Sequence, residues 1–243
     1  MAVKEAVTGE TEAKRSARAR GLVAPPPLES GDRLMRREFE RRYQTMLRIK
    51  KAELIEGVVY MPSPVRHRSH GKPHIYISAW LGAYCAATPG VEPSDNVTVR
   101  LDADNEVQPD ALLRLEPAAG GHSRVGEDDY VEGPPELIVE IAASSAAIDL
   151  HDKLKAYRRN GVLEYVVWQI YDKRVDWYEL KEDEYAPLAP DQAGLIRSRV
   201  FPGLHLNVKA LLEGDLAAVL ADLQKGLATD EHKAFVERLS VTP

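Results

Sequence analysis

Two acidic side chains stand in surroundings where a carboxylate is costly. Glu140 lies within the run ELIVEIAA, which is apolar on both sides of it, and Asp110 leads directly into the apolar run ALLRL. Burying a carboxylate is unfavourable unless a positive charge lies beside it. Two acids on neighbouring strands, with their side chains on one face, would together hold a hard cation such as Mg²⁺. Either acid alone is explained more simply by a buried salt bridge.

A lysine is the third group that such a site needs, because phosphodiester hydrolysis benefits from a positive charge near the attacking water. The helix predicted over residues 149–160 offers Lys153 and Lys155. Its apolar positions form one stripe: Leu150, Leu154 and Tyr157. At about 100° per residue Lys153 borders this stripe and Lys155 points away, so we favour Lys153. The simpler role for Lys153 is an ion pair with Asp149, four residues before it.

Three histidines, His67, His70 and His74, follow the strand predicted over residues 52–61. His70 and His74 are one helical turn apart, a spacing that suits zinc, but no cysteine partners or HExxH pattern accompany them. The alternatives are a contact with substrate, for which His70 is favoured, and a surface or helix-capping role.

The composition indicates a globular protein. The 243 residues are 44% hydrophobic and 29% charged, and no apolar stretch approaches the roughly 20 residues of a membrane helix. The first residues lack the apolar core of a secretory signal, so we expect a cytoplasmic protein. The net charge of −6 argues against indiscriminate binding to nucleic acid. Residues 33–51 are nevertheless basic, and a helix there would present Arg36, Arg37 and Arg41 to solvent or to phosphates.

Apolar periodicity predicts one α+β domain over residues 31–243, after a disordered tail and lead-in strap over residues 1–30. Asp32 and Asp149 are the expected caps of two helices. Helices are predicted over residues 33–46, 70–85, 149–160, 208–227 and 230–239. Strands are predicted over residues 52–61, 96–101, 107–115, 134–143, 163–170 and 174–180, and near residue 185. The strand that carries Glu140 is apolar on both faces, as a central strand is.

An ordered set of motifs resembles a known family. The set is ELIEG, then PD, then ELIVEIAASS, then DLHDKLKAYRRNGVLEYVVW, with the lead-in GDRLMRREFERRY and the late FPGL. It resembles the Uma-two (Uma2) family, bacterial restriction endonuclease-like proteins within the PD-(D/E)XK nuclease superfamily. The resemblance runs from about Gly31 to past Leu204. PD or EIxxS alone carries little information, whereas the whole set in order is specific.

The resemblance implies roles for four residues. Asp110 and Glu140 are the expected metal ligands, Glu53 of ELIEG is the expected additional acid, and Lys153 takes the lysine role. Glu53 is preferred to Glu56 because it shares the strand face of Ile55. One departure concerns the lysine, which in the standard superfamily pattern lies two residues beyond the strand acid, where this chain has an alanine.

We therefore expect a restriction-endonuclease-like core, a central mixed β-sheet flanked by helices, with Asp110 and Glu140 at a cleft edge. The predicted activity is an Mg²⁺-dependent endodeoxyribonuclease, with Mn²⁺ as the substitute cation, in which Lys153 orients or activates the attacking water. DNA is the expected partner, and cutting both strands of a duplex favours a homodimer. One alternative is a non-catalytic nucleic-acid-binding or regulatory module. Another, encouraged by the net acidity, is a hydrolase or scaffold that acts on something other than nucleic acid.

Overall fold

The structure is a computed structural model that describes residues 24–61 and 64–241. Residues 1–23 of the tail and lead-in strap predicted over residues 1–30 lie outside the described residues. Within the lead-in segment, Leu28 is buried beside Phe39 and Leu54.

The centre of the protein is a six-stranded mixed sheet. Its two middle strands, β9 (Leu137–Ala142) and β10 (Glu164–Gln169), run parallel and are buried along their whole length. The other neighbours pair antiparallel. The strand order is β12 (Glu184–Pro187), β11 (Arg174–Lys181), β10, β9, β6 (Ala111–Leu115) and β3 (Val91–Ser94). The predicted mixed sheet with a central apolar strand is confirmed.

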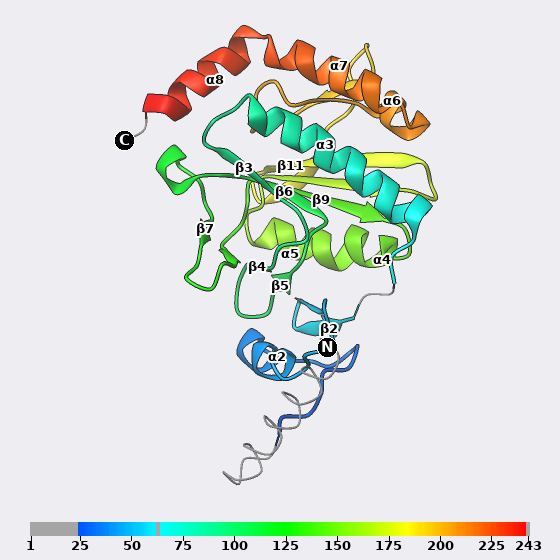
Figure 1. The fold of residues 1–243 in the computed structure, drawn as a ribbon, viewed down its shortest axis with the longest axis vertical. Helices are drawn as coiled ribbons and strands as arrows, with labels where there is room; N and C mark the ends of the chain where they lie inside the picture. The colour runs from blue at the N-terminus through cyan, green and yellow to red at the C-terminus, as the bar shows by residue number, and fades with distance from the viewer. Residues whose placement is uncertain (1–23, 62–63, 242–243) are drawn as a thin grey trace, which may run out of the picture.

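Helices cover both faces of this sheet. Helix α3 (Lys72–Ala86) lies on one face, beneath the C-terminal helices, and α5 (Leu154–Arg159) lies on the other (Figure 1). Alternate residues of β9 accordingly enter two different cores. Val139 belongs to the same core as Trp80 of α3, whereas Ile138 belongs to the core that contains Tyr157 of α5. Glu140 follows the parity of Ile138 and therefore points toward α5.

A second sheet of short strands lies on the α5 side of the molecule (Figure 1). Its order is β2 (Val58–Tyr60), β1 (Glu53–Ile55), β5 (Glu106–Val107), β4 (Val99–Arg100), β8 (Val131–Glu132) and β7 (Arg124–Val125). The single strand predicted over residues 52–61 is wrong, because β1 and β2 form a hairpin. Glu56 and Gly57 make its turn with φ values of 50° and 74°. A left-handed glutamate is uncommon, so the sequence lacked the usual turn signal.

Helix α2 (Arg36–Tyr43) packs on this second sheet through Phe39, which is buried. The predicted cap at Asp32 is wrong, since the helix starts after Met35 and no side chain caps it. Met35, the residue just before the helix, is 59% exposed. The carboxylate of Asp32 instead accepts a hydrogen bond from the amide of Glu29.

Two helices start earlier than predicted. The π-turn η1 (His67–Gly71) precedes α3, so residues predicted as loop are helical. Pro73 fits there because the first turn of a helix needs no amide donor at that position. The second run is α4 (Ala146–Ile148), η3 (Asp149–Lys153) and α5. The predicted cap role of Asp149 is therefore wrong: this residue lies inside the helical run and is buried.

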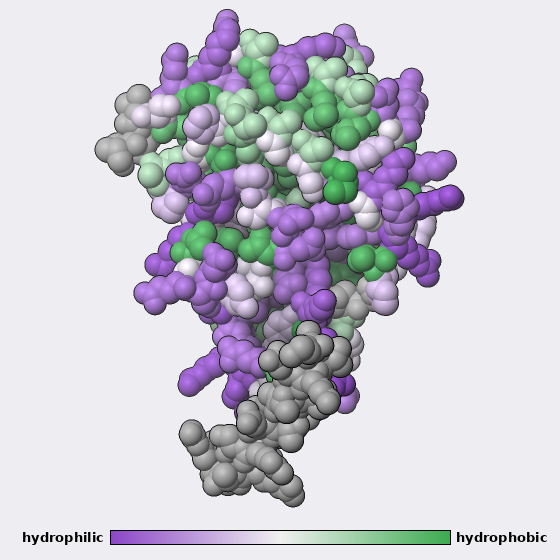
Figure 2. All heavy atoms as spheres, viewed as in Figure 1, coloured by the Kyte–Doolittle hydropathy of each residue, from purple (hydrophilic) through white to green (hydrophobic). Residues whose placement is uncertain are grey.

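The chain ends in α6 (Val208–Glu213), α7 (Leu216–Leu227) and α8 (Asp230–Val241). One helix was predicted over residues 208–227, but Gly214 adopts a left-handed φ of 79° and divides it. Figure 2 shows hydrophobic residues gathered over α3 and the C-terminal helices, and hydrophilic residues over the opposite half of this face. In the part of the chain that the structure describes, no helix has the length and apolar character that crossing a membrane requires.

Candidate active site

The sheet register brings the two predicted strand acids together. Strands β6 and β9 are antiparallel, with Ala111 opposite Val139, so the next pair along is Asp110 and Glu140. Residues opposite each other in antiparallel strands project from the same face. Asp110 Oδ2 accepts a hydrogen bond of 2.8 Å from the amide of Ile141, which fixes its carboxylate at the end of β9.

Lys153 reaches the same place from the helix that follows β9. Its Nζ donates to Glu140 Oε1 at 2.8 Å and lies 3.0 Å from Glu53 Oε1. A third carboxylate, that of Asp149, has its Oδ1 at 3.8 Å from the same nitrogen. Sequence analysis placed Lys153 on the border of the buried stripe, and its side chain is 5% exposed. Lys155 points to the surface, where it pairs with Glu56.

We call these five residues the acid–lysine cluster: Glu53, Asp110, Glu140, Asp149 and Lys153. All five are buried. Further donors hold the acids in place, namely Tyr157 Oη on Glu140 Oε1 (2.8 Å), Gln108 N on Glu53 Oε1 (2.8 Å) and Ser145 Oγ on Asp149 Oδ2 (2.6 Å).

Asp149 is the cluster member that sequence reasoning did not assign to the site. Its spacing of four residues from Lys153 and its place at the start of the predicted helix indicate a helix cap and a local ion pair. The burial of Asp149 follows from the helix beginning at Ala146, which turns residue 149 toward the sheet. The motif DLHDK contains the signal, since an acid one turn before a buried lysine faces the same way.

The cluster contains more negative than positive charge. Burial raises the pKa of Glu140 to about 8, and although Lys153 opposes this, the carboxylates of Asp149, Asp110 and Glu53 add to it. Burial also raises the pKa of Asp149. Burial pushes the pKa of Glu53 upward, but Lys153 and other donors outweigh it and the net shift is downward. A bound cation would relieve this repulsion.

Lys153 itself remains protonated. Burial alone would lower its pKa, but the carboxylates of Glu140, Glu53 and Asp149 raise that pKa well above the usual value of 10.5. These carboxylates therefore favour the positively charged form of Lys153.

The donor chemistry of the cluster fits a divalent cation of the kind that the family implies. Within residues 24–61 and 64–241, no set of three or more His, Cys, Asp or Glu side chains is gathered so as to hold a metal ion. Mg²⁺, however, is commonly held by one or two carboxylates and keeps several waters. Asp110 and Glu140 provide such a pair from adjacent strands, and Lys153 and Tyr157 both engage the same Glu140 oxygen, Oε1.

The three histidines that were singled out as candidates, His67, His70 and His74, differ in their positions. His70 Nε2 lies 3.3 Å from Asp110 Oδ1, so this histidine is beside the cluster. His74 Nε2 donates to the backbone oxygen of Asp110 at 2.8 Å. His67 is exposed in the π-turn.

The predicted phosphate-contacting arginines lie on α2, at the end of the molecule opposite the C-terminal helices (Figure 1). Arg36 donates to the backbone oxygen of Asp102, and Arg41 makes a two-pronged ion pair with Glu38. Arg37 is exposed. These local pairs reduce the positive charge that α2 presents to a polyanion.

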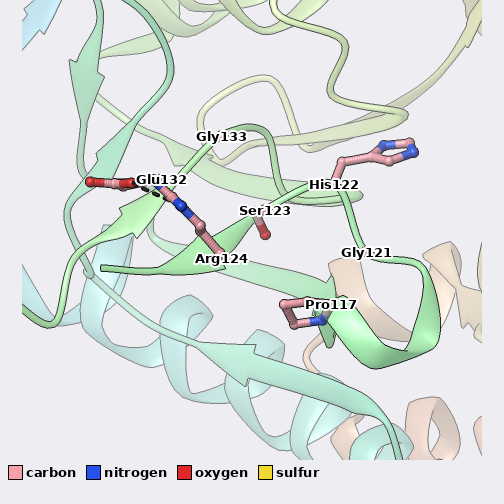
Figure 3. A pocket seen from close by; sticks show the side chains of 7 residues that line it. All are labelled: Pro117, Gly121, His122, Ser123, Arg124, Glu132 and Gly133. Carbon is pink, nitrogen blue, oxygen red and sulfur yellow. Dashed lines mark hydrogen bonds and ion pairs between the residues drawn. The ribbon is translucent and has the colours of Figure 1, made fainter. Parts of the chain in front are cut away.

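A shallow pocket of about 440 Å³ lies elsewhere, between the β7–β8 hairpin and the turn before it (Figure 3). It is lined by Pro117, Gly121, His122, Ser123, Arg124, Glu132 and Gly133. Arg124 and Glu132 pair with each other at 2.7 Å. None of the predicted site residues lines this pocket, so we place the chemistry at the acid–lysine cluster.

The sheet and its cluster define the class of protein. A mixed sheet flanked by helices, with acids on adjacent strands and a buried lysine from the following helix, is a restriction-endonuclease-like nuclease fold. The predicted fold class is confirmed.

The chain belongs to the Uma2 family, whose model is described as "Putative restriction endonuclease" and matches residues 36–209. This confirms the family resemblance and supports a nuclease-like function. A solved structure titled as a putative nuclease belonging to DUF820, from Anabaena variabilis ATCC 29413, is similar in fold. Its TM-score is 0.52 at 14% sequence identity, over 67% of this chain and 90% of that chain. No curated protein matches this chain.

Proposed function

We propose that the protein is a cytoplasmic, divalent-metal-dependent endonuclease that hydrolyses DNA phosphodiester bonds at the acid–lysine cluster. The observation that carries the proposal is the contact of one buried ammonium, Lys153 Nζ, with Glu140 at 2.8 Å and Glu53 at 3.0 Å. Such a buried arrangement is costly for stability alone, because three carboxylates, those of Glu53, Glu140 and Asp149, lie around a single ammonium.

Asp110 and Glu140 are the residues that would hold the cation. A bound Mg²⁺ or Mn²⁺ supplies Lewis-acid stabilisation of the phosphoryl oxygens and lowers the pKa of water. Asp110 is held in position by the amide of Ile141, and Glu140 by Lys153 and Tyr157. Fixed ligands of this kind need no rearrangement when the substrate binds, which favours catalysis.

Lys153 contributes a permanent positive charge in the proposed mechanism. A protonated ammonium in a buried site stabilises negative charge that develops on the phosphate, and it orients a water by donating a hydrogen bond. Glu53 and Asp149 keep this lysine protonated and in place, so both act as positioning residues.

A plasmid-cleavage assay with Mg²⁺ or Mn²⁺ tests the proposal. Wild type should convert supercoiled DNA to nicked or linear forms, and Glu140→Ala and Lys153→Ala should reduce the rate by at least about 10²-fold. Lys155→Ala is the matched control, because Lys155 lies on the same helix but is 60% exposed and pairs with Glu56. Equal cutting by all variants would contradict the mechanism.

The absence of cutting by wild type would favour the non-catalytic binding module instead. Salt-dependent DNA binding then separates that alternative from a protein that does not act on nucleic acid, because phosphate neutralisation makes affinity fall with salt. Sedimentation of the active protein measures whether it is a homodimer, the state that cutting both strands of a duplex favours.

A further inference from the structure

One oxygen of Asp110 faces a histidine rather than the sheet. Asp110 Oδ2 is engaged by the amide of Ile141 at 2.8 Å, whereas Oδ1 lies 3.3 Å from His70 Nε2. The oxygen of Asp110 that remains for a cation is therefore the one beside this imidazole. A cation bound there meets His70 as its neighbour.

Three features of the structure orient His70. The π-turn η1 adds a residue to the helical turn before α3, and such turns often occur at functional sites. His74 anchors the helix to Asp110, because His74 Nε2 donates a hydrogen bond to the backbone carbonyl of Asp110 at 2.8 Å. The rings of His70 and His74 stack with their centroids 5.9 Å apart. His70 is consequently oriented by its surroundings rather than free in solvent.

The side chain of His70 also lies on the open side of the cluster. It is 20% exposed, whereas the side chain of Asp110 is 7% exposed and that of Glu140 is 4% exposed. Water or substrate that approaches Asp110 from this side meets His70 first. Lys153 occupies the buried side, where it contacts Glu53 and Glu140.

The separation of the two donors matches a shared cation. Two cis ligands of an octahedral ion, each about 2.1 Å from it, lie about 3 Å apart. The observed distance between His70 Nε2 and Asp110 Oδ1 is 3.3 Å. Only a few tenths of an ångström separate this arrangement from a pair of ligands.

We infer that His70 is drawn in as a nitrogen ligand when a cation binds at Asp110 and Glu140, and that it shifts the preference of the site from Mg²⁺ toward transition-metal dications. These three side chains are not already gathered as a metal site in the described residues, so binding requires a small inward shift of His70. The inference rests on the proposed function, since it concerns the same cation. Mg²⁺ prefers an all-oxygen environment, and an imidazole ligand favours first-row transition metals. The histidine therefore decides which metal loads the site.

Pulsed electron paramagnetic resonance of bound Mn²⁺ tests this directly, because it detects the magnetic coupling of a coordinated ¹⁴N nucleus. Wild type should show the coupling of one imidazole nitrogen, and His70→Gln should lose it. His67→Gln is the matched control, since His67 is exposed in the same turn. Competition between Mn²⁺ and Mg²⁺ should give at least about a tenfold loss of Mn²⁺ affinity in His70→Gln, with a smaller change for Mg²⁺.

Each outcome has one meaning. Mn²⁺ that binds to wild type without nitrogen coupling would overturn the inference. If Asp110→Ala then abolishes the binding of Mn²⁺, the proposed metal site at Asp110 and Glu140 still stands, although His70 is not its ligand. If Asp110→Ala and Glu140→Ala both bind Mn²⁺ as wild type does, the proposed site fails and the inference fails with it. Since the wild-type spectrum is itself decisive, the test does not depend on how well any variant folds.

Discussion

Two buried glutamates on neighbouring strands of the same sheet are held in opposite ways. Glu140 of β9 contacts an ammonium and a phenol, and it lies among three other carboxylates. Glu164 of β10 accepts hydrogen bonds from neutral groups only: Ser198 Oγ, Arg199 N, Val200 N and Trp177 Nε1. Glu140 points toward α5, whereas Glu164 follows the parity of Val166 and points toward α3.

The difference separates a chemical site from a structural anchor. Three of the four donors to Glu164 come from the segment that precedes β14 (His205–Asn207), so this carboxylate fastens a loop to the sheet. The repulsion between carboxylates around Glu140 would not help to hold a loop in place. A buried acid is therefore a candidate for catalysis when other acids and a lysine surround it, and an anchor when backbone amides do. Four measurements would break or sharpen this contrast.

Lys153→Met should have the largest effect. It leaves buried carboxylates without their positive partner, and we expect a loss of about 3–5 kcal/mol in the free energy of unfolding without added metal. Urea denaturation measures this loss. Lys155→Met, which removes only an exposed pair with Glu56, should cost less than about 1 kcal/mol. Equal stability of the two variants would mean that the acids do not depend on Lys153.

Glu164→Gln should cost about 1–3 kcal/mol of unfolding free energy. The new amide group would face two donors, Ser198 Oγ and Trp177 Nε1, so those hydrogen bonds are lost. Cation binding should be unchanged, because Glu164 belongs to the other face of the sheet. Thermal stabilisation by Mn²⁺ checks this, and a loss of stabilisation in Glu164→Gln would remove the distinction between the two glutamates.

Glu164 should also make the free energy of unfolding depend on pH. Burial raises the pKa of Glu164 to about 7 in the folded protein, from an ordinary value of 4.5, despite the donors that lower it. The folded state then binds more protons than the unfolded state between about pH 4.5 and 7, so the stability contributed by Glu164 falls as pH rises through this window. The slope is at most about 1.4 kcal/mol per pH unit.

Comparison of wild type with Glu164→Gln isolates the contribution of Glu164 to the pH dependence, since the other titrating groups are present in both. The difference in unfolding free energy between wild type and variant should decrease from pH 4.5 to 7 and then level off. A difference that rises with pH would show that the hydrogen-bond donors, rather than burial, control the pKa of Glu164.

His122→Ala should have the smallest effect. Glu136 is another buried acid held by backbone amides, those of Leu115 (2.7 Å) and His122 (2.8 Å). The imidazole of His122 lies 3.8 Å away and is 53% exposed, so its removal should change unfolding free energy by less than about 0.5 kcal/mol. Calorimetry at neutral pH measures the change. A loss above 1 kcal/mol would show that amide-held acids also need a charged partner.

The sequence predicted the chemistry-bearing strands and helix, because their patterns are local. The apolar run around Glu140 could only be a buried strand, and the stripe of the following helix turned Lys153 inward and Lys155 outward. Asp110 could be placed at the start of a strand for the same reason. The hairpin of β1 and β2 was missed because its turn uses Glu56 in a left-handed conformation.

The sequence by itself determined which side chains face a core, because strand alternation and helix periodicity are patterns of neighbouring residues. Only the tertiary structure decided which of those faces meet. The Gln108 amide that holds Glu53 is 55 positions away, and His70 reaches Asp110 through a π-turn and the stacking of His74. Arg36 of α2 likewise donates to the backbone oxygen of Asp102, 66 positions away, a contact that helical periodicity does not predict. Such meetings depend on strand register and helix packing across the whole chain, and no local pattern encodes them.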